Sequence, residues 1–191
     1  GTKLSDRMSI LACAKHYAGY SDTQGGQDAS EADIPRRRLL SYFLPPFEKA
    51  ARDGCATFMT GYQAIDGVPC TASKWLLTDT LKKDWKFKGF VVTDWDNVGR
   101  MHWEQKVCAT MAEAAEAAII AGNDMMMATP SFFEAALAAA KKKQALTRDI
   151  DRAVRRILTV KFAMGLFEDP RLPDTEQQKV TIGRPEHRES L

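Results

Sequence analysis

Short apolar segments alternate with longer amphipathic segments along this chain of 191 residues. The short segments span four to six residues and are bounded by glycine or polar residues, which is typical of buried strands. The longer segments repeat apolar residues every three or four positions, which is typical of helices. The pattern predicts strands over residues 10–15, 56–60, 90–94 and 124–128, and helices over residues 36–53, 71–85, 110–121, 131–143 and 147–164.

Two of the predicted helical regions contain residues that mark where a helix begins or is interrupted. Pro45-Pro46 predicts a break or a restart inside the helical region 36–53, because proline cannot continue a helix from its preceding turn. Thr71 is placed to cap the helix that follows it. Between the first strand and the first helix, residues 19–33 are polar and rich in glycine, and they are expected to form a loop.

The order strand, helix, strand, helix, repeated four times, predicts an α/β fold with a parallel sheet and crossover helices. Four such units cannot close an eight-stranded barrel. The chain is therefore either a small open sheet or part of a barrel whose other strands are missing. A partial barrel would leave unpaired strand edges and an uncovered apolar interior, which a stable soluble monomer avoids.

Composition narrows the class of protein. The chain is 45% apolar and 27% charged, which suits a globular domain or part of one. Its net charge of +2 gives no electrostatic case for nucleic-acid binding. No apolar run approaches the roughly 20 residues that a membrane span needs, so no membrane partner is expected. The cysteines lack CxxC spacing, which argues against zinc and favours buried free thiols in a reducing compartment such as the cytoplasm, with a disulfide as the alternative. They are Cys13, Cys55, Cys70 and Cys108.

The most informative segment is Gly89–Trp95, a short apolar run that ends on a carboxylate. The carboxyl end of a parallel strand is where α/β folds place their chemistry. Asp94 is therefore a candidate nucleophile, and the indole of Trp95 offers a flat apolar surface for a sugar ring. The alternative is that Asp94 caps the following helix or turn.

Polar side chains also follow the other predicted strands. Lys15 and His16 end the first, Tyr62 follows the second, and Asp124 belongs to the fourth. Lys15 can donate to a sugar hydroxyl, and His16 can donate or accept. Tyr62 is placed to hydrogen-bond Asp94 and hold its rotamer. Taken singly, a histidine or a tyrosine is more often structural; their joint occurrence at successive strand ends predicts a site.

These residues belong to a series of motifs that resembles glycoside hydrolase family 3. No single motif is decisive, but their order along the chain is shared from about residue 10 to residue 188. The motifs are Lys15-His16-Tyr17, Gly25–Asp28, Leu44–Phe47, Met59–Tyr62, Asp66–Pro69, Gly89–Trp95, Arg155–Leu158, Lys161-Phe162, Gly165–Phe167 and Pro185–Arg188.

The resemblance implies a retaining, exo-acting β-glycosidase whose first domain is a (β/α)8 TIM-type barrel. Residues 1–168 would be the C-terminal portion of that barrel, incomplete on its own, and residues 169–191 a linker leading toward a following domain. The expected partners are a β-linked glucoside or oligosaccharide and the remaining segments of the same enzyme. No cofactor and no metal are implied. β-Glucosidase is the first expectation; β-xylosidase, mixed specificity and a non-catalytic carbohydrate-binding fragment are the alternatives.

The resemblance also implies roles for individual residues. Asp94 falls on the family's nucleophile, and Trp95 on the aromatic residue beside it. Lys15 and His16 fall on the pair that binds hydroxyls of the terminal sugar, and Tyr62 on a tyrosine close to the nucleophile. Asp124 matches an aspartate to which no catalytic role is assigned.

The loop around Gln27 and Asp28 belongs to the expected sugar-binding site but departs from the family pattern. Gln27 stands where arginine is common, so the planar fork and the charge are lost, although an amide still hydrogen-bonds a hydroxyl. An N-acetylglucosaminidase branch carries a histidine in this loop, and here the loop continues Asp28-Ala29-Ser30, which disfavours that branch.

The expected mechanism needs a second carboxyl group. In a retaining glycosidase the nucleophile forms a glycosyl-enzyme ester, and an acid/base about 5–5.5 Å away protonates the leaving oxygen. The family usually takes this acid from an α/β sandwich domain that is absent here. We expect the acid/base to come from outside this segment, with Asp96, Asp66 and Glu104 as weaker local candidates.

Overall fold

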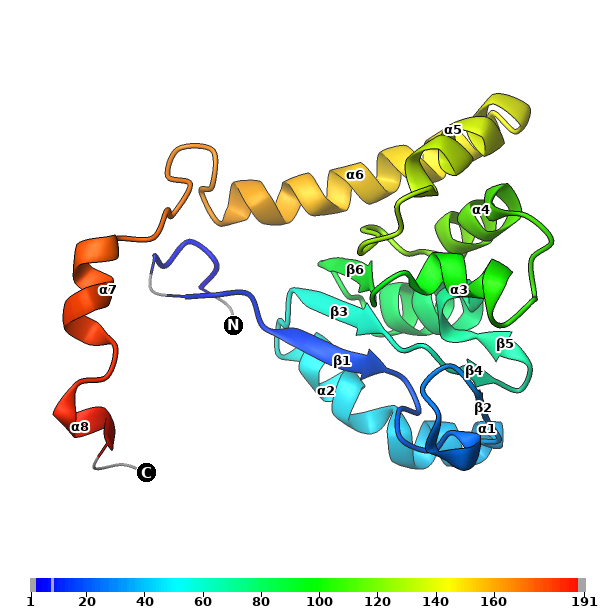
Figure 1. Cartoon of the computed structure of the whole chain (residues 1–191), viewed down its shortest axis with the longest axis horizontal. Coiled ribbons are helices and arrows are strands. Elements are labelled where there is room, and N and C mark those ends of the chain that lie inside the picture. Colours follow the sequence, from blue (N-terminus) through cyan, green and yellow to red (C-terminus); the bar gives the residue numbers. More distant parts are fainter. Residues whose placement is uncertain (1–2, 8, 189–191) are drawn as a thin grey trace.

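The computed structural model describes residues 3–7 and 9–188. Its centre is a parallel sheet of three strands in the order β1 (Cys13–Tyr17), β3 (Thr57–Thr60) and β6 (Phe90–Thr93) (Figure 1). The register is continuous between β3 and β6, where Thr60 pairs with Thr93. The carboxyl ends of these two strands therefore lie side by side.

A second, smaller sheet is built from segments that follow the main strands. β2 (Glu31–Ala32) pairs in parallel with β4 (Ala64–Ile65), which forms a hairpin with β5 (Val68–Pro69). Because β2 follows β1 and β4 follows β3 along the chain, this sheet fixes the loops that leave the carboxyl ends of those strands. Figure 1 shows the hairpin and β2 on the side toward which the β1 arrow points.

Helices pack against the main sheet, and α6 is the longest of those that the structure describes (Figure 1). Beyond it, α7 and α8 lie away from the sheet. The helical elements are η1 (Gln24–Gly26), α1 (Arg36–Arg38), η2 (Leu39–Phe43), α2 (Pro45–Arg52), η3 (Cys70–Ala72), η4 (Trp75–Asp84), α3 (Asn97–Trp103), α4 (Met111–Ala121), α5 (Phe132–Lys142), α6 (Ala145–Ala163), α7 (Thr175–Thr181) and α8 (Pro185–Arg188).

The two faces of the main sheet differ in what covers them. Tyr17, Phe58 and Val91 are fully buried on the face covered by α2 and η4, and the Tyr17 hydroxyl donates to the carbonyl of Leu76 at 3.1 Å. On the other face, Phe90 and Val92 pack against α6. Lys15 of β1 is exposed. Part of the face that a closed barrel would turn inward is thus open in this chain.

The predicted fourth strand over residues 124–128 is wrong in its extent. Only one bridge forms, between Val92 and Met125, and the Thr93 amide donates to the Met125 carbonyl at 2.9 Å. One step further on, the Met127 amide bonds the side-chain oxygen of Thr93 instead of a backbone carbonyl, at 2.9 Å. Because that side chain takes the place of the next acceptor, the ladder ends after one pair, and the segment runs beside β6 without becoming a strand.

Two predictions about helix ends have different outcomes. The restart at Pro45-Pro46 is confirmed, because α2 begins at Pro45 directly after η2, where proline costs no intrahelical bond. The cap at Thr71 is wrong. Thr71 is buried in η3 against Thr60, and the Ser73 side chain accepts the first-turn amide of η4 instead.

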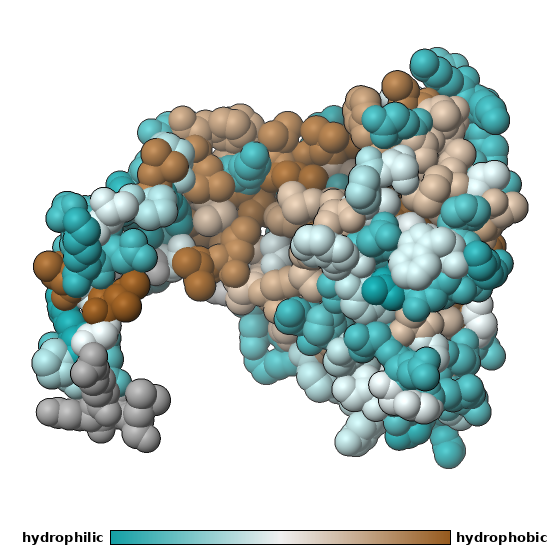
Figure 2. All heavy atoms as spheres, in the orientation of Figure 1, coloured by the Kyte–Doolittle hydropathy of each residue, from teal (hydrophilic) through white to brown (hydrophobic). Residues whose placement is uncertain are grey.

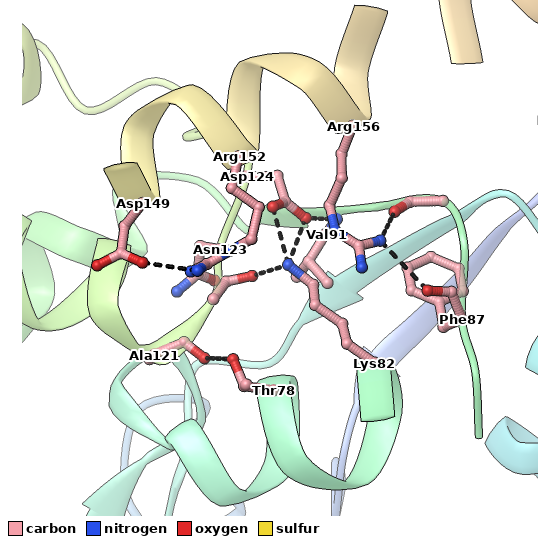
Figure 3. A network of polar contacts seen from close by, with 12 residues as sticks. Thr78, Lys82, Phe87, Val91, Ala121, Asn123, Asp124, Asp149, Arg152 and Arg156 are labelled. Carbon is pink, nitrogen blue, oxygen red and sulfur yellow. Dashed lines mark hydrogen bonds and ion pairs between the residues drawn. The ribbon is translucent and has the colours of Figure 1, made fainter. Parts of the chain in front are cut away.

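A buried ion pair connects helix η4 to strand β6 (Figure 3). Lys82 of η4 and Asp124 lie 2.7 Å apart, and the same carboxylate accepts the Val91 amide at 2.8 Å. Burial lowers the pKa of Lys82 to about 8, and burial raises the pKa of Asp124. Arg156 of α6 donates to the carbonyl of Gly89 at 2.6 Å. Asp124 is therefore a structural residue of the layer between sheet and helices, not a strand-end group of the site.

The segment predicted to be a linker begins with contacts to the amino-terminal part of the chain. Arg171 donates to the carbonyls of Met164, Ser9 and Leu4 at 2.6, 2.9 and 3.0 Å. It continues into α7, whose first turn is capped by the carboxylate of Asp174. That residues 169–191 lead toward another domain stays a prediction, and residues 189–191 lie outside the described part.

All four cysteines are free thiols, as predicted, but only Cys70 is buried; Cys13 is exposed. Across the described ranges, every helix is too short or too polar to pass through a membrane.

Candidate functional site

Asp94 lies at the carboxyl end of β6, and its two carboxylate oxygens face different partners. Oδ1 accepts the hydroxyl of Tyr62 at 3.0 Å and the amide of Trp95 at 2.7 Å. Oδ2 lies 3.2 Å from Nε2 of His16, and 15% of the side chain is exposed. Helix α3 begins at Asn97, and the Asp94 side chain caps none of its amides. The carboxylate is therefore oriented by the ends of three strands and still reaches solvent.

Tyr62 provides the hydrogen bond that the sequence predicts. Its pKa is raised to about 12, first by burial and then by the bond to the Asp94 carboxylate. The phenol therefore remains a donor at all ordinary pH values. Arg100 lies with its guanidinium carbon 4.5 Å from the centre of the phenol ring, and the positive charge partly offsets the rise in pKa.

His16 contacts the carboxylate, which the sequence did not predict. Its ring packs on Tyr20 at a centroid distance of 4.4 Å, and the Tyr20 hydroxyl donates to Asp28 at 3.0 Å. Burial lowers the pKa of His16, while the negative charge of Asp94 acts in the opposite direction. His16 thus joins the Asp94 carboxylate to the loop that carries Asp28.

Lys15 and Gln27 are less engaged than the sequence suggested. The contacts described for the Asp94 carboxylate come from Tyr62, His16 and the Trp95 amide, and not from Lys15. Lys15 and Gln27 are both exposed. Both remain predicted sugar-binding residues.

The Tyr62 segment is held by Asn97, Arg100 and Gln105, three side chains that were not singled out from the sequence. Asn97, fully buried, donates to the carbonyl of Gly61 at 2.9 Å. Gln105 donates its side-chain amide to the carbonyl of Tyr62 at 2.8 Å. With Arg100 over the ring, these contacts fix the phenol from a helix that starts three residues after Asp94. The polar spacing of Asn97 and Arg100, one helical turn apart, was the available signal.

Two indoles near the carboxylate are exposed. Trp95 is 64% exposed and Trp103 is 47% exposed. The Trp103 indole nitrogen donates to Asp96 at 2.9 Å. The backbone of Asp96 has the left-handed conformation, with φ of 49°, and its amide donates to the carbonyl of Met127 at 3.0 Å. The turn after the candidate nucleophile is thus fixed at both its backbone and its side chain.

Of the three local carboxylates that the sequence offered as the acid/base residue, two have another partner and the third lines a cavity. Asp96 accepts the Trp103 indole, and Glu104 pairs with Arg100 at 2.5 Å. Asp66 lies in the turn between β4 and β5 and lines a cavity of about 290 Å³ together with Trp75. Among residues 3–7 and 9–188, no three His, Cys, Asp or Glu side chains are grouped to hold a metal ion.

The comparisons with known proteins identify a family. The model of the glycosyl hydrolase family 3 N-terminal domain matches residues 2–160. A β-xylosidase from Formosa agariphila is 37% identical over 99% of this chain and 27% of its own length. The lysosomal β-glucosidase of Dictyostelium discoideum is 36% identical over 95% of this chain and 22% of its own length.

Solved structures are also similar. A β-glucosidase involved in saponin metabolism from intestinal bacteria superposes with a TM-score of 0.89 at 57% identity, over 95% of this chain and 24% of that one. A β-glucosidase from Listeria innocua in complex with glucose superposes with a TM-score of 0.83 at 30% identity, over 88% of this chain and 23% of that one. The chain spans about a quarter of the length of these relatives. The architecture of an incomplete α/β barrel predicted from the sequence agrees with these matches.

Proposed function

Because the chain belongs to glycosyl hydrolase family 3, we propose that it carries the nucleophile part of the active site of a retaining, exo-acting β-glycosidase. The observation that carries this proposal is the Asp94 carboxylate, which is held by Tyr62 and His16 at the ends of neighbouring strands and is still open to solvent. A carboxylate that only stabilised the fold would not need to reach solvent at this edge.

In the proposed reaction, Asp94 attacks the anomeric carbon as the leaving oxygen is protonated, and a glycosyl-enzyme ester forms. Water then hydrolyses the ester, with the acid/base residue acting as base. The hydrogen bond from Tyr62 keeps the carboxylate in one rotamer. Lys15, His16, Gln27, Asp28 and Trp95 are the proposed contacts of the terminal sugar.

We propose β-glucosidase as the activity, with β-xylosidase as the second candidate. The first is supported by the 57% identity to a β-glucosidase of known structure. The second is supported by the 37% identity to a β-xylosidase. The two sugars differ by one hydroxymethyl group, which a pocket distinguishes by shape and by the hydrogen bonds it leaves unpaired.

We further propose that other segments of the same enzyme complete the barrel and supply the acid/base. β1 pairs only with β3 within the described chain, so its other edge is open. On α6, the side chains of Val154, Leu158 and Phe162 are 48%, 38% and 61% exposed, and Figure 2 shows apolar surface along this helix. An open strand edge and an exposed apolar face each favour a covering partner.

Assays of the full-length protein test this function. We expect hydrolysis of 4-nitrophenyl β-glucoside with the β-anomer as the first product by NMR, and a lower kcat/KM on the β-xyloside. Asp94→Asn should lower kcat by at least about 10³-fold, because the covalent step is lost. Asp79→Asn is the control, since that carboxylate pairs with Lys83 on the surface. Inversion of configuration, or full activity of Asp94→Asn, would contradict the proposal.

A further inference from the structure

We propose that Trp103 is a binding platform for the leaving-group side of the substrate, and that its ligand is a flat or apolar ring: an aromatic aglycone or the apolar face of a second sugar. This inference rests on the proposed function and adds a substrate class to it. It concerns a residue outside every motif that the sequence singled out.

The Trp103 indole is exposed but held in place. Its nitrogen donates to Asp96 at 2.9 Å, and the guanidinium carbon of Arg100 lies 5.2 Å from the ring centre. Even so, 47% of the residue is exposed. An exposed aromatic ring whose orientation is already fixed loses little conformational entropy when a ligand packs against it. These contacts give Trp103 a preorganised apolar surface.

Contacts connect this surface to the reacting carboxylate. Arg100 lies between the rings of Trp103 and Tyr62, 5.2 and 4.5 Å from their centres. The Tyr62 hydroxyl in turn reaches Asp94 at 3.0 Å. The exposed indole is therefore separated from the partner of the nucleophile by one guanidinium group. A substrate bound at Asp94 and extending toward α3 would meet it.

The side chains on the α3 side of Asp94 differ in their chemistry from those on the β1 side. The proposed contacts of the terminal sugar on the β1 side, Lys15, His16 and Asp28, are hydrogen-bonding groups. On the α3 side, Asp96 is engaged by the Trp103 indole and Arg100 by Glu104. The exposed indoles of Trp95 and Trp103 are the flat apolar groups offered there. Aromatic stacking accepts rings of different kinds, so this side suits a variable leaving group better than a sugar defined by its hydroxyls.

Two substrates that differ only in the leaving group test the platform in the full-length protein. We expect Trp103→Ala to lower kcat/KM on 4-nitrophenyl β-glucoside by about 3- to 10-fold, mainly through KM, and to change kcat/KM on methyl β-glucoside by less than about 2-fold. Trp103→Phe, which keeps a flat ring, should lie between wild type and Trp103→Ala. The ratio of the two kcat/KM values does not depend on the fraction of folded enzyme.

Tyr42→Ala is the control, because Tyr42 is 70% exposed on η2 and has no part in the proposed site. Inhibition by glucose, which occupies the terminal-sugar site, should be unchanged in Trp103→Ala. An equal loss on both substrates, or no loss on either, would overturn the platform and leave the glycosidase function intact. A wild-type protein that hydrolyses neither substrate would overturn the glycosidase function itself, and the platform with it.

Discussion

The hydroxyl of Tyr62 and the carboxylate of Asp94 are joined by a hydrogen bond of 3.0 Å across the carboxyl ends of β3 and β6. The register of the two strands places these residues together, since Thr60 pairs with Thr93 just before them. The bond fixes one carboxylate oxygen and leaves the other toward His16.

Removing the hydroxyl should weaken catalysis without affecting the fold. We expect Tyr62→Phe to lower kcat/KM by about 10- to 100-fold, because a hydrogen bond to a charged group contributes about 1.5–3 kcal/mol. Tyr42→Phe, at an exposed position on η2, should leave kcat/KM unchanged. Steady-state kinetics of the full-length protein check this, and near-normal kcat/KM in Tyr62→Phe would show that the phenol does not support the reaction.

The pH dependence follows from the raised pKa of Tyr62. With a pKa of about 12, the phenol is protonated and remains a donor below that pH. A fall in kcat/KM between about pH 7 and pH 10 must therefore come from another group, such as the acid that protonates the leaving oxygen. We expect that basic limb to persist in Tyr62→Phe at the same pH. Its disappearance in the variant would mean that Tyr62 titrates in this range.

The contact from Gln105 is expected to position Tyr62. Gln105→Glu replaces an amide donor by a carboxylate that cannot donate to the Tyr62 carbonyl 2.8 Å away in the native protein. We expect kcat to fall by about 2- to 10-fold, as for loss of one neutral hydrogen bond, with little change in KM. Gln178→Glu on α7 adds the same charge on an exposed helix and serves as the control. A change in KM alone would contradict a positioning role.

The buried pair of Lys82 and Asp124 is expected to matter for stability rather than for chemistry. Lys82→Met leaves a buried carboxylate unpaired and should lower the free energy of unfolding by about 3–5 kcal/mol. Adding Asp124→Leu should recover much of this loss, because no lone buried charge remains. Lys83→Met, which breaks only the surface pair with Asp79, should cost less than about 1 kcal/mol. Denaturant titrations distinguish these cases.

Local sequence pattern was sufficient for most of the fold. The run Phe90–Thr93 is apolar, β-forming and bounded by Gly89, and it is the fully buried strand β6. Thr110 and Gly122 bound α4 because a hydroxyl caps its first turn and a glycine takes the left-handed position after it. The segment after Asp124 does not continue as a strand, because the Met127 amide donates to the Thr93 side chain instead of to a backbone carbonyl. That bond depends on a tertiary contact, which the local pattern does not show.

The sequence predicted the site residues that directly follow strands. It did not predict the contacts that depend on the direction of a side chain. Asp94 and Tyr62 meet because both follow paired strands. His16 was assigned to sugar hydroxyls, but the structure places it 3.2 Å from Asp94. Arg100 and Gln105 were missed because tertiary packing places them beside Tyr62, and the polar spacing of Asn97 and Arg100 does not say which segment they contact.

The most direct measurement is the identity of the residue that forms the covalent intermediate. The full-length protein is incubated with 2,4-dinitrophenyl 2-deoxy-2-fluoro-β-glucoside, which slows hydrolysis of the glycosyl-enzyme, and is then digested and analysed by mass spectrometry. We expect one added fluoroglucosyl group on the peptide that contains Gly89–Trp95, located on Asp94. A label on a different carboxylate, or an unlabelled protein that nevertheless hydrolyses β-glucosides, would contradict it.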